Sequence, residues 1–198
     1  MKKNKSSYFI ISFFFMFSCT LDIRQLPTPV KISEVENKET KINLSIRTFQ
    51  IENELLAEIQ PAWKYTFTSY LKNDYFISNN VIFSDSKNEN KDFYEIDILM
   101  KPILNEVRNY WLSLPVIFPF TGYWPIHYRE LEYSINIHYS VYKNHNLIYS
   151  DNIFEKDNLT LYFYGLIRTQ KFENLIEDTN LRAINSCVKS ISLYLFQH

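Results

Sequence analysis

The stretch LEYSINIHYSVY, residues 131–142, decides the fold because apolar and polar side chains alternate along its whole length. A period of two is typical of a β-strand with one face in the core and the other in solvent. A polar turn at residues 143–146 follows, and residues 147–154 return along the first strand. These segments predict a β-hairpin. Its first strand turns six side chains to the core: Leu131, Tyr133, Ile135, Ile137, Tyr139 and Val141.

Upstream, residues 42–49, 75–83 and 93–100 predict three more strands. In the third of these, Tyr94, Ile96, Ile98 and Met100 fall on one face, and Glu95 and Asp97 fall on the other. Pro61 suits the first turn of a helix, which we expect to end near Asn73 and Asp74.

Downstream, Thr179 or Asn180 is expected to cap a C-terminal helix. Residues 157–171 fit either a helix or a strand, and we favour a helix. The order of elements predicts an α+β fold, with a mostly antiparallel sheet of about five strands and two or three helices on one face. A single domain is expected over residues 41–198, and its last helix carries an apolar stripe of Leu181, Ile184, Val188, Ile191 and Leu195.

The N-terminus resembles a bacterial lipoprotein signal. Three lysines precede an apolar run that is too short to span a bilayer, and Ser18-Cys19 follows at once. We therefore expect residues 1–18 to be a cleaved signal peptide, Cys19 to carry lipid, and residues 19–40 to form a flexible tether. A plain signal peptide or a short buried helix remains the alternative. Thr20 after the cysteine resembles the sorting pattern of outer-membrane lipoproteins.

Residues 109–128 read NYWLSLPVIFPFTGYWPIHY, and no charged side chain occurs between positions 110 and 126. Three prolines exclude a continuous transmembrane helix. This apolar connection either folds back to plug the core or contacts a membrane or a protein partner. Under the second interpretation, residues 110–126 bind an envelope protein or a second copy, through Trp111, Leu114, Val116, Ile117, Phe118, Phe120, Tyr123 and Trp124.

The chain resembles small α/β lipoproteins of bacterial envelopes, which include TolB N-terminal-like domains and auxiliary lipoproteins of transport systems. The resemblance is one of pattern and covers most of residues 40–196. It implies an assembly or scaffold role and brings no catalytic residues to this sequence. It depends on strands like Ile42–Phe49 and Tyr94–Met100, on Phe76, and on Leu114, Thr121-Gly122 and Pro125.

Several chemistries are excluded or disfavoured. The chain has two glycines, Gly122 and Gly165, which lie too far apart for a phosphate-binding loop, a dinucleotide-binding turn or a nucleophile elbow. No metal-binding motif is present, and we expect no metal and no cofactor. Glu130 and Glu132 share one face of a strand and are interpreted as solvated charges. Cys187 is interpreted as a small buried hydrophobe.

Without its first 18 residues, the chain has 18 basic and 22 acidic side chains, a net charge of −4. A nucleic-acid partner is therefore not expected. We expect a non-enzymatic scaffold or accessory lipoprotein of the outer membrane, on its periplasmic face and anchored in the bilayer through Cys19. The alternative is a surface-exposed lipoprotein that binds an external ligand or a host molecule.

Overall fold

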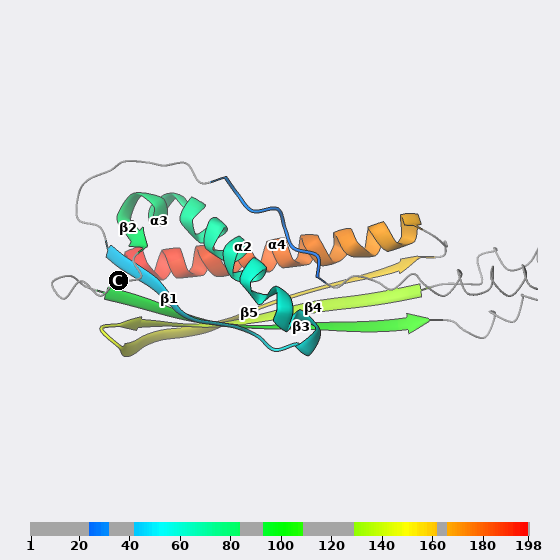
Figure 1. Cartoon of the computed structure of the whole chain (residues 1–198), viewed down its shortest axis with the longest axis horizontal. Helices are drawn as coiled ribbons and strands as arrows, with labels where there is room; N and C mark the ends of the chain where they lie inside the picture. Colours follow the sequence, from blue (N-terminus) through cyan, green and yellow to red (C-terminus); the bar gives the residue numbers. More distant parts are fainter. Residues whose placement is uncertain (1–23, 32–41, 84–92, 109–128, 162–165, 198) are drawn as a thin grey trace, which may run out of the picture.

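The protein is described by a computed structural model, which covers residues 24–31, 42–83, 93–108, 129–161 and 166–197. One layer is a sheet and the other is helical, and the helices cover one face of the sheet (Figure 1). This arrangement confirms the predicted α+β class. The elements are β1 (Ile42–Ile51), the 3-10 helix η1 (Glu54–Ile59), α2 (Gln60–Asn73), α3 (Tyr75–Asn80), β2 (Val81–Phe83), β3 (Phe93–Arg108), β4 (Arg129–Lys143), β5 (Asn146–Leu161) and α4 (Leu166–Gln197).

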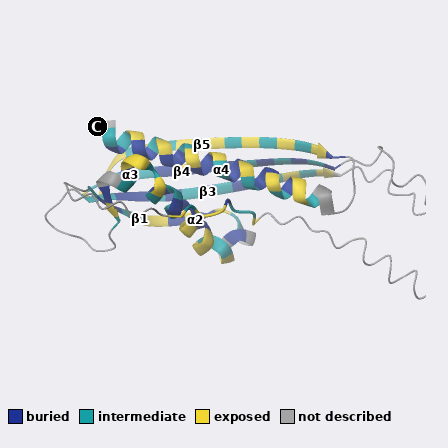
Figure 2. Ribbon diagram, turned by 90° about the horizontal axis from the view of Figure 1, so that it is seen from above, coloured by how far each residue is buried: buried dark blue, intermediate teal, exposed yellow. Residues whose placement is uncertain are grey.

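The five strands of the sheet lie in the order β2-β1-β3-β4-β5. The two pairings of β1, with β2 and with β3, are parallel and short, whereas β3–β4 and β4–β5 are antiparallel and run almost the full length of the strands. The sheet is therefore mostly antiparallel, as predicted. Strand β4 lies between β3 and β5, and every second side chain along most of its length is buried (Figure 2).

The predicted hairpin is confirmed, and its register follows the alternation of the sequence. Leu131, Tyr133, Ile135, Ile137, Tyr139 and Val141 all belong to the buried core. Asn144 and His145 join the strands with φ values of 49° and 68°. A positive φ at both central residues is the geometry of a two-residue hairpin turn, whose twist matches the twist of the strands. The return strand runs beyond Phe154, to Leu161.

The strand predicted over residues 75–83 is wrong for most of its length. Residues 75–80 form α3, and only Val81–Phe83 form a strand. The cause is Asp74, whose Oδ1 accepts hydrogen bonds from the backbone N–H groups of Phe76 (3.1 Å) and Ile77 (3.2 Å). An aspartate in this position is a favoured N-cap, so a new helix begins where the sequence indicated only the end of one.

The end of the third predicted strand also differs from the prediction. β3 continues past Met100 and through Pro102 to Arg108. Because β1 ends opposite Met100, this part of β3 has no neighbour on that side among the described residues, and a strand edge tolerates a proline without an N–H donor.

At the far end of the sheet, the buried guanidinium of Arg129 pairs with Glu106 and lies 5.2 Å from the ring centre of Phe172.

The predicted start of the C-terminal helix is also wrong. Residues 157–161 belong to β5, and α4 extends from Leu166, so Thr179 and Asn180 lie inside the helix rather than at its cap. Both side chains are buried, where the Thr179 hydroxyl donates to the Leu175 carbonyl (2.7 Å). The predicted stripe is confirmed for Ile184, Val188, Ile191 and Leu195, which belong to the core.

Candidate functional site

Residues 24–31, which we call the N-terminal segment, lie on the helical layer (Figure 1). The carbonyl oxygen of Thr28 accepts a hydrogen bond from the Tyr70 hydroxyl (3.0 Å), and the N–H of Val30 donates to Oγ of Ser69 (3.2 Å). Leu26 packs against the core. This part of the expected tether is therefore attached to the domain, and the free tether that we predicted does not include it.

A third attachment of the N-terminal segment lies at Gln25. Its carbonyl oxygen accepts a hydrogen bond of 2.8 Å from Nδ2 of Asn180, in the middle of α4. Oδ1 of the same amide accepts from the hydroxyl of Tyr133 in β4 (2.7 Å). Burial raises the pKa of the Tyr133 phenol, so this hydroxyl remains a donor. One buried amide thus joins the sheet, a helix and the N-terminal segment.

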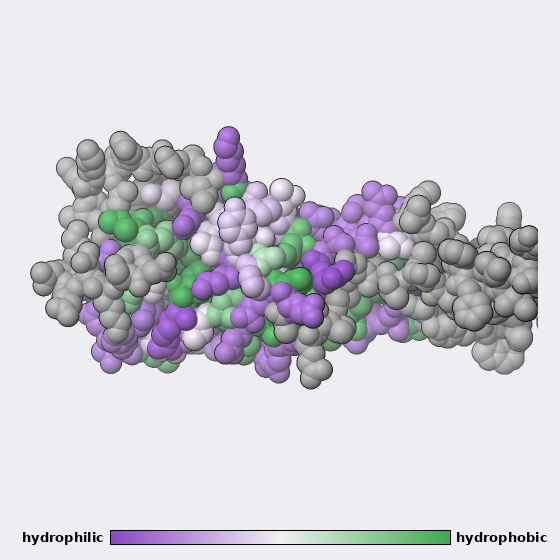
Figure 3. Space-filling view, in the orientation of Figure 1, coloured by the Kyte–Doolittle hydropathy of each residue, from purple (hydrophilic) through white to green (hydrophobic). Residues whose placement is uncertain are grey.

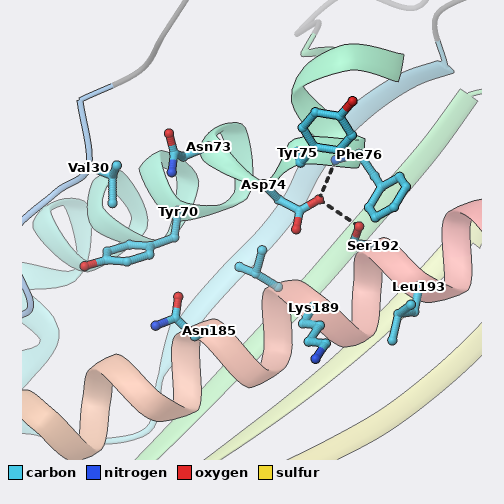
Figure 4. A pocket seen from close by; sticks show the side chains of 11 residues that line it. Val30, Tyr70, Asn73, Asp74, Tyr75, Phe76, Asn185, Lys189, Ser192 and Leu193 are labelled. Carbon is cyan, nitrogen blue, oxygen red and sulfur yellow. Dashed lines mark hydrogen bonds between the residues drawn. The ribbon is translucent and has the colours of Figure 1, made fainter.

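A cavity of about 430 Å³ opens between this segment and helices α2, α3 and α4 (Figure 4). Cavities of 300–1,000 Å³ are the usual size for small-molecule sites. Its lining combines aromatic rings, amides, one carboxylate and one ammonium group. The lining residues are Val30, Tyr70, Asn73, Asp74, Tyr75, Phe76, Asn185, Val188, Lys189, Ser192 and Leu193.

Asp74 is the central polar group of this cavity, and its two oxygens have different roles. Oδ1 accepts from the N–H groups of Phe76 and Ile77 and from Oγ of Ser192, at 2.7 Å (Figure 4). These three donors come from two helices and fix the carboxylate in one orientation. Among the described residues, no donor binds Oδ2. A rigidly held acceptor is thus left available at the cavity.

Asn73 on α2 and Asn185 on α4 lie on either side of the Tyr70 ring (Figure 4). Within the described parts of the chain, neither amide side chain has a hydrogen-bond partner. Val188 contributes an apolar side chain from the core stripe of α4. Apolar surface also gathers around α3, where the rings of Tyr75 and Phe76 are 73% and 51% exposed (Figure 3). The cavity therefore combines solvent-accessible polar groups with an apolar surface.

The site residues predicted from the sequence lie elsewhere. Cys19 and the whole of residues 110–126, from Trp111 to Trp124, lie outside the described residues. Glu132 lies on the solvent side of β4, where hydrogen bonds from Lys156 and Asn105 lower the pKa of its carboxyl group. In the described part of the chain, no cluster of three or more His, Cys, Asp or Glu side chains is arranged to hold a metal ion.

The cavity was not predicted from the sequence, although the sequence contains one indication of it at Asn73-Asp74. Asn73-Asp74 was interpreted as the end of a helix, whereas an aspartate followed by Tyr75 and Phe76 is equally the start of one. The remaining lining residues come from segments as far apart as Val30 and Leu193, and no local pattern joins them.

One protein-family model matches residues 10–192 of the chain. No curated protein matches the chain. Among solved structures, a minor lipoprotein from Acinetobacter baumannii is similar with a TM-score of 0.41 and 11% identity, over 77% of this chain and 91% of that one. A neuraminyllactose-binding hemagglutinin homolog from Helicobacter pylori is similar with a TM-score of 0.42 and 12% identity, over 87% and 89% of the two chains. None of the described helices is both long enough and apolar enough to cross a membrane.

Proposed function

We propose that this chain, which belongs to the family whose model matches residues 10–192, is a lipid-anchored protein of the bacterial envelope. It acts there without enzymatic activity, as an assembly, scaffold or accessory factor. Cys19 holds it in the outer membrane, on the periplasmic face. The observation that carries this proposal is the attachment of residues 24–31 to the helices, because it connects the lipid position almost directly to the folded domain.

The reach of the chain supports one orientation of the domain at the bilayer. Five residues lie between Cys19 and Gln25, and the six Cα–Cα steps from one to the other span at most about 22 Å when fully extended. Gln25 is held beside Tyr133 through Asn180. A strand rises about 3.4 Å per residue, so Tyr133 lies about 34 Å from Lys143, at the hairpin end of β4. Its distance from Arg129, at the other end of β4, is only about 14 Å. The short reach favours an approach to the bilayer by the Arg129 end.

The same end of the sheet carries the apolar connection. β3 ends at Arg108 and β4 begins at Arg129, so residues 110–126 join the two strands there. In the proposal, this uncharged segment contacts the bilayer surface or a membrane-bound partner, such as an envelope protein or a second copy of the chain. Tryptophan and tyrosine near its ends suit a membrane interface. Lipid anchor and apolar segment then act on one side of the domain.

Two titratable groups support the non-enzymatic part of the proposal. Oδ1 of Asp74 accepts three hydrogen bonds that stabilise the junction of α2, α3 and α4, which is a structural role. Burial raises the pKa of the Cys187 thiol, and Asp151 raises it further. The nucleophilic thiolate form of Cys187 is therefore disfavoured.

A second candidate function is favoured by the cavity itself. A protein that binds an external ligand at the cell surface needs a concave site with unpaired polar groups, and the cavity between α2 and α4 has both. This alternative keeps the same lipid anchor and differs in the side of the membrane on which the domain lies. Protease treatment of intact cells separates the two, because only a surface-exposed domain is cleaved.

The anchor is tested with the two cysteines of the chain, Cys19 and Cys187. Cys19→Ala should leave a protein that is unprocessed or soluble, because lipid chains contribute about 0.8 kcal/mol per buried CH₂ group to membrane binding. Cys187→Ala is the matched control and should stay in the membrane fraction with an acylated residue 19. The intact mass of each product is measured after detergent extraction. A fully processed Cys19→Ala protein in the detergent phase would contradict the proposal.

A further inference from the structure

We propose that the cavity between α2, α3 and α4 binds a neutral sugar residue, with Asp74 as its central hydrogen-bond acceptor. This inference is independent of the lipid anchor, because it depends only on the described residues around the cavity. It would hold for either side of the membrane.

The first argument is the state of the Asp74 carboxylate. Three donors fix Oδ1, from Phe76, Ile77 and Ser192, while Oδ2 has none among the residues that the structure describes. An ionised carboxylate accepts hydrogen bonds and donates none. A ligand that approaches Oδ2 must therefore offer a donor, such as a hydroxyl group. The carboxylate needs no rearrangement to receive it, which lowers the entropy cost of binding.

The second argument is the pair of amides. Asn73 and Asn185 both line the cavity, from α2 and α4, on opposite sides of the Tyr70 ring (Figure 4). Each amide offers both donors and an acceptor. A sugar hydroxyl is itself both donor and acceptor, so it can pair with either side of an amide. Polar groups that line one cavity from different helices suit a compact ligand, whereas an extended peptide would need a row of groups along one edge.

The third argument is the apolar part of the lining. Val30, Val188 and the Tyr70 ring supply apolar surface between the polar groups. A pyranose ring has one face of C–H groups and a rim of hydroxyl groups, which matches this division. Removing its C–H face from water against these side chains is favourable in proportion to the area buried.

The two charged side chains of the cavity lining disfavour small ligands that carry a net charge. The lining holds one carboxylate, Asp74, and one ammonium group, Lys189. A sulfate, a phosphate or an acidic sugar would approach the Asp74 carboxylate with the same sign of charge. A cationic ligand would meet Lys189 with the same sign. A neutral ligand avoids both penalties.

The experiment uses the full chain in a detergent without a sugar headgroup. The probes are the methyl glycosides of glucose, galactose and N-acetylglucosamine, each at about 10 mM, a concentration that detects a Kd of about 1 mM. Saturation-transfer NMR reports binding, and calorimetric titration gives the Kd. We expect at least one glycoside to bind. No saturation transfer to any of the three would overturn the proposal.

Asp74→Asn is the decisive variant. Asparagine caps helices as well as aspartate does, so its amide oxygen can keep the role of Oδ1 while an NH₂ donor replaces Oδ2. We expect the Kd to rise at least about tenfold with little change in melting temperature. Asp178→Asn, at an exposed carboxylate of α4 that does not line the cavity, is the matched control and should bind like the wild type.

Two further measurements keep the inference falsifiable. Asn185→Ala removes an exposed amide from the cavity wall and should weaken binding by several-fold without unfolding the protein. Trialanine is tested as a peptide probe at the same concentration. Unchanged glycoside binding by both Asp74→Asn and Asn185→Ala, or equal binding of trialanine, would contradict a sugar site here.

Discussion

The hydroxyl group of Tyr133, in the first third of β4, donates a hydrogen bond of 2.7 Å to Oδ1 of Asn180 in the middle of α4. Both side chains are at most 1% exposed. The amide nitrogen of Asn180 is used as well, since it donates to the carbonyl of Gln25. Every polar atom of this junction has a partner, and a segment 155 residues away from Asn180 in the sequence is joined to the core.

Removing the Tyr133 hydroxyl tests this junction. Tyr133→Phe leaves Oδ1 of Asn180 buried without its donor, which should lower the free energy of unfolding by about 1–3 kcal/mol. Chemical denaturation measures the loss. Tyr65→Phe is the control, because Tyr65 is 65% exposed on α2 and its change should cost almost nothing. Equal stability of the two variants would show that the junction contributes little.

The register of β4 predicts opposite effects for neighbouring positions. Ile137 is fully buried, so Ile137→Asp should cost several kcal/mol by placing a charge in the core. His138 is exposed on the other face, and His138→Asp should cost less than about 1 kcal/mol. Thermal melts of both variants test this. The prediction fails if His138→Asp is as destabilising as Ile137→Asp.

The pair of Arg47 and Asp97 predicts a dependence on acid. Partial burial of Asp97 alone would raise its pKa, but hydrogen bonds from Arg47 and Thr48 outweigh this and lower the pKa of the carboxyl group. The stabilisation is therefore present above about pH 4, the ordinary value for aspartate, and is lost as the pH falls through the lower folded-state pKa.

Asp97→Asn should consequently be less stable than the wild type at pH 6, by up to about 1 kcal/mol for this solvent-accessible pair. The difference should shrink as the pH is lowered below 4. Urea titrations at pH 6 and pH 3 measure it. A difference of the same size at both pH values would show that the pairing is not its source.

Cys187 is predicted to be inert in the folded protein. Its side chain is fully buried, and this burial raises the pKa of the thiol. A maleimide should therefore modify Cys187 only after denaturant is added. Mass spectrometry before and after unfolding counts the label. Rapid modification under native conditions would mean that this part of α4 opens readily.

The sequence predicted the elements in which alternation is strict. From Leu131 to Val141 in β4 and from Tyr94 to Met100 in β3, every second side chain is apolar. The buried core contains these side chains except Tyr94, which is partly buried against it. Prediction failed where one residue type serves two purposes. Asp74 can end one helix or begin another, and the structure uses it for both, since it follows α2 and caps α3.

Thr179 and Asn180 misled the prediction for a related reason. Both are favoured caps, but here a buried helix interior satisfies their polar groups through Leu175, Tyr133 and Gln25. No local sequence pattern indicates partners that lie so far apart along the chain. The same limit applies to the cavity, because Asp74, Asn73 and Asn185 line one space only through the packing of α2 against α4.

The central claim is that the N-terminal segment directs one end of the sheet toward the bilayer. Thr160 and Asn146 lie near opposite ends of β5, about 48 Å apart at about 3.4 Å per residue, and both are exposed. Two variants, Thr160→Cys and Asn146→Cys, are each made in a Cys187→Ala background and labelled with a donor fluorophore. Energy transfer to acceptor-labelled lipids is then measured in proteoliposomes. We predict clearly stronger transfer from position 160. Equal transfer from the two positions, or stronger transfer from position 146, would contradict the account.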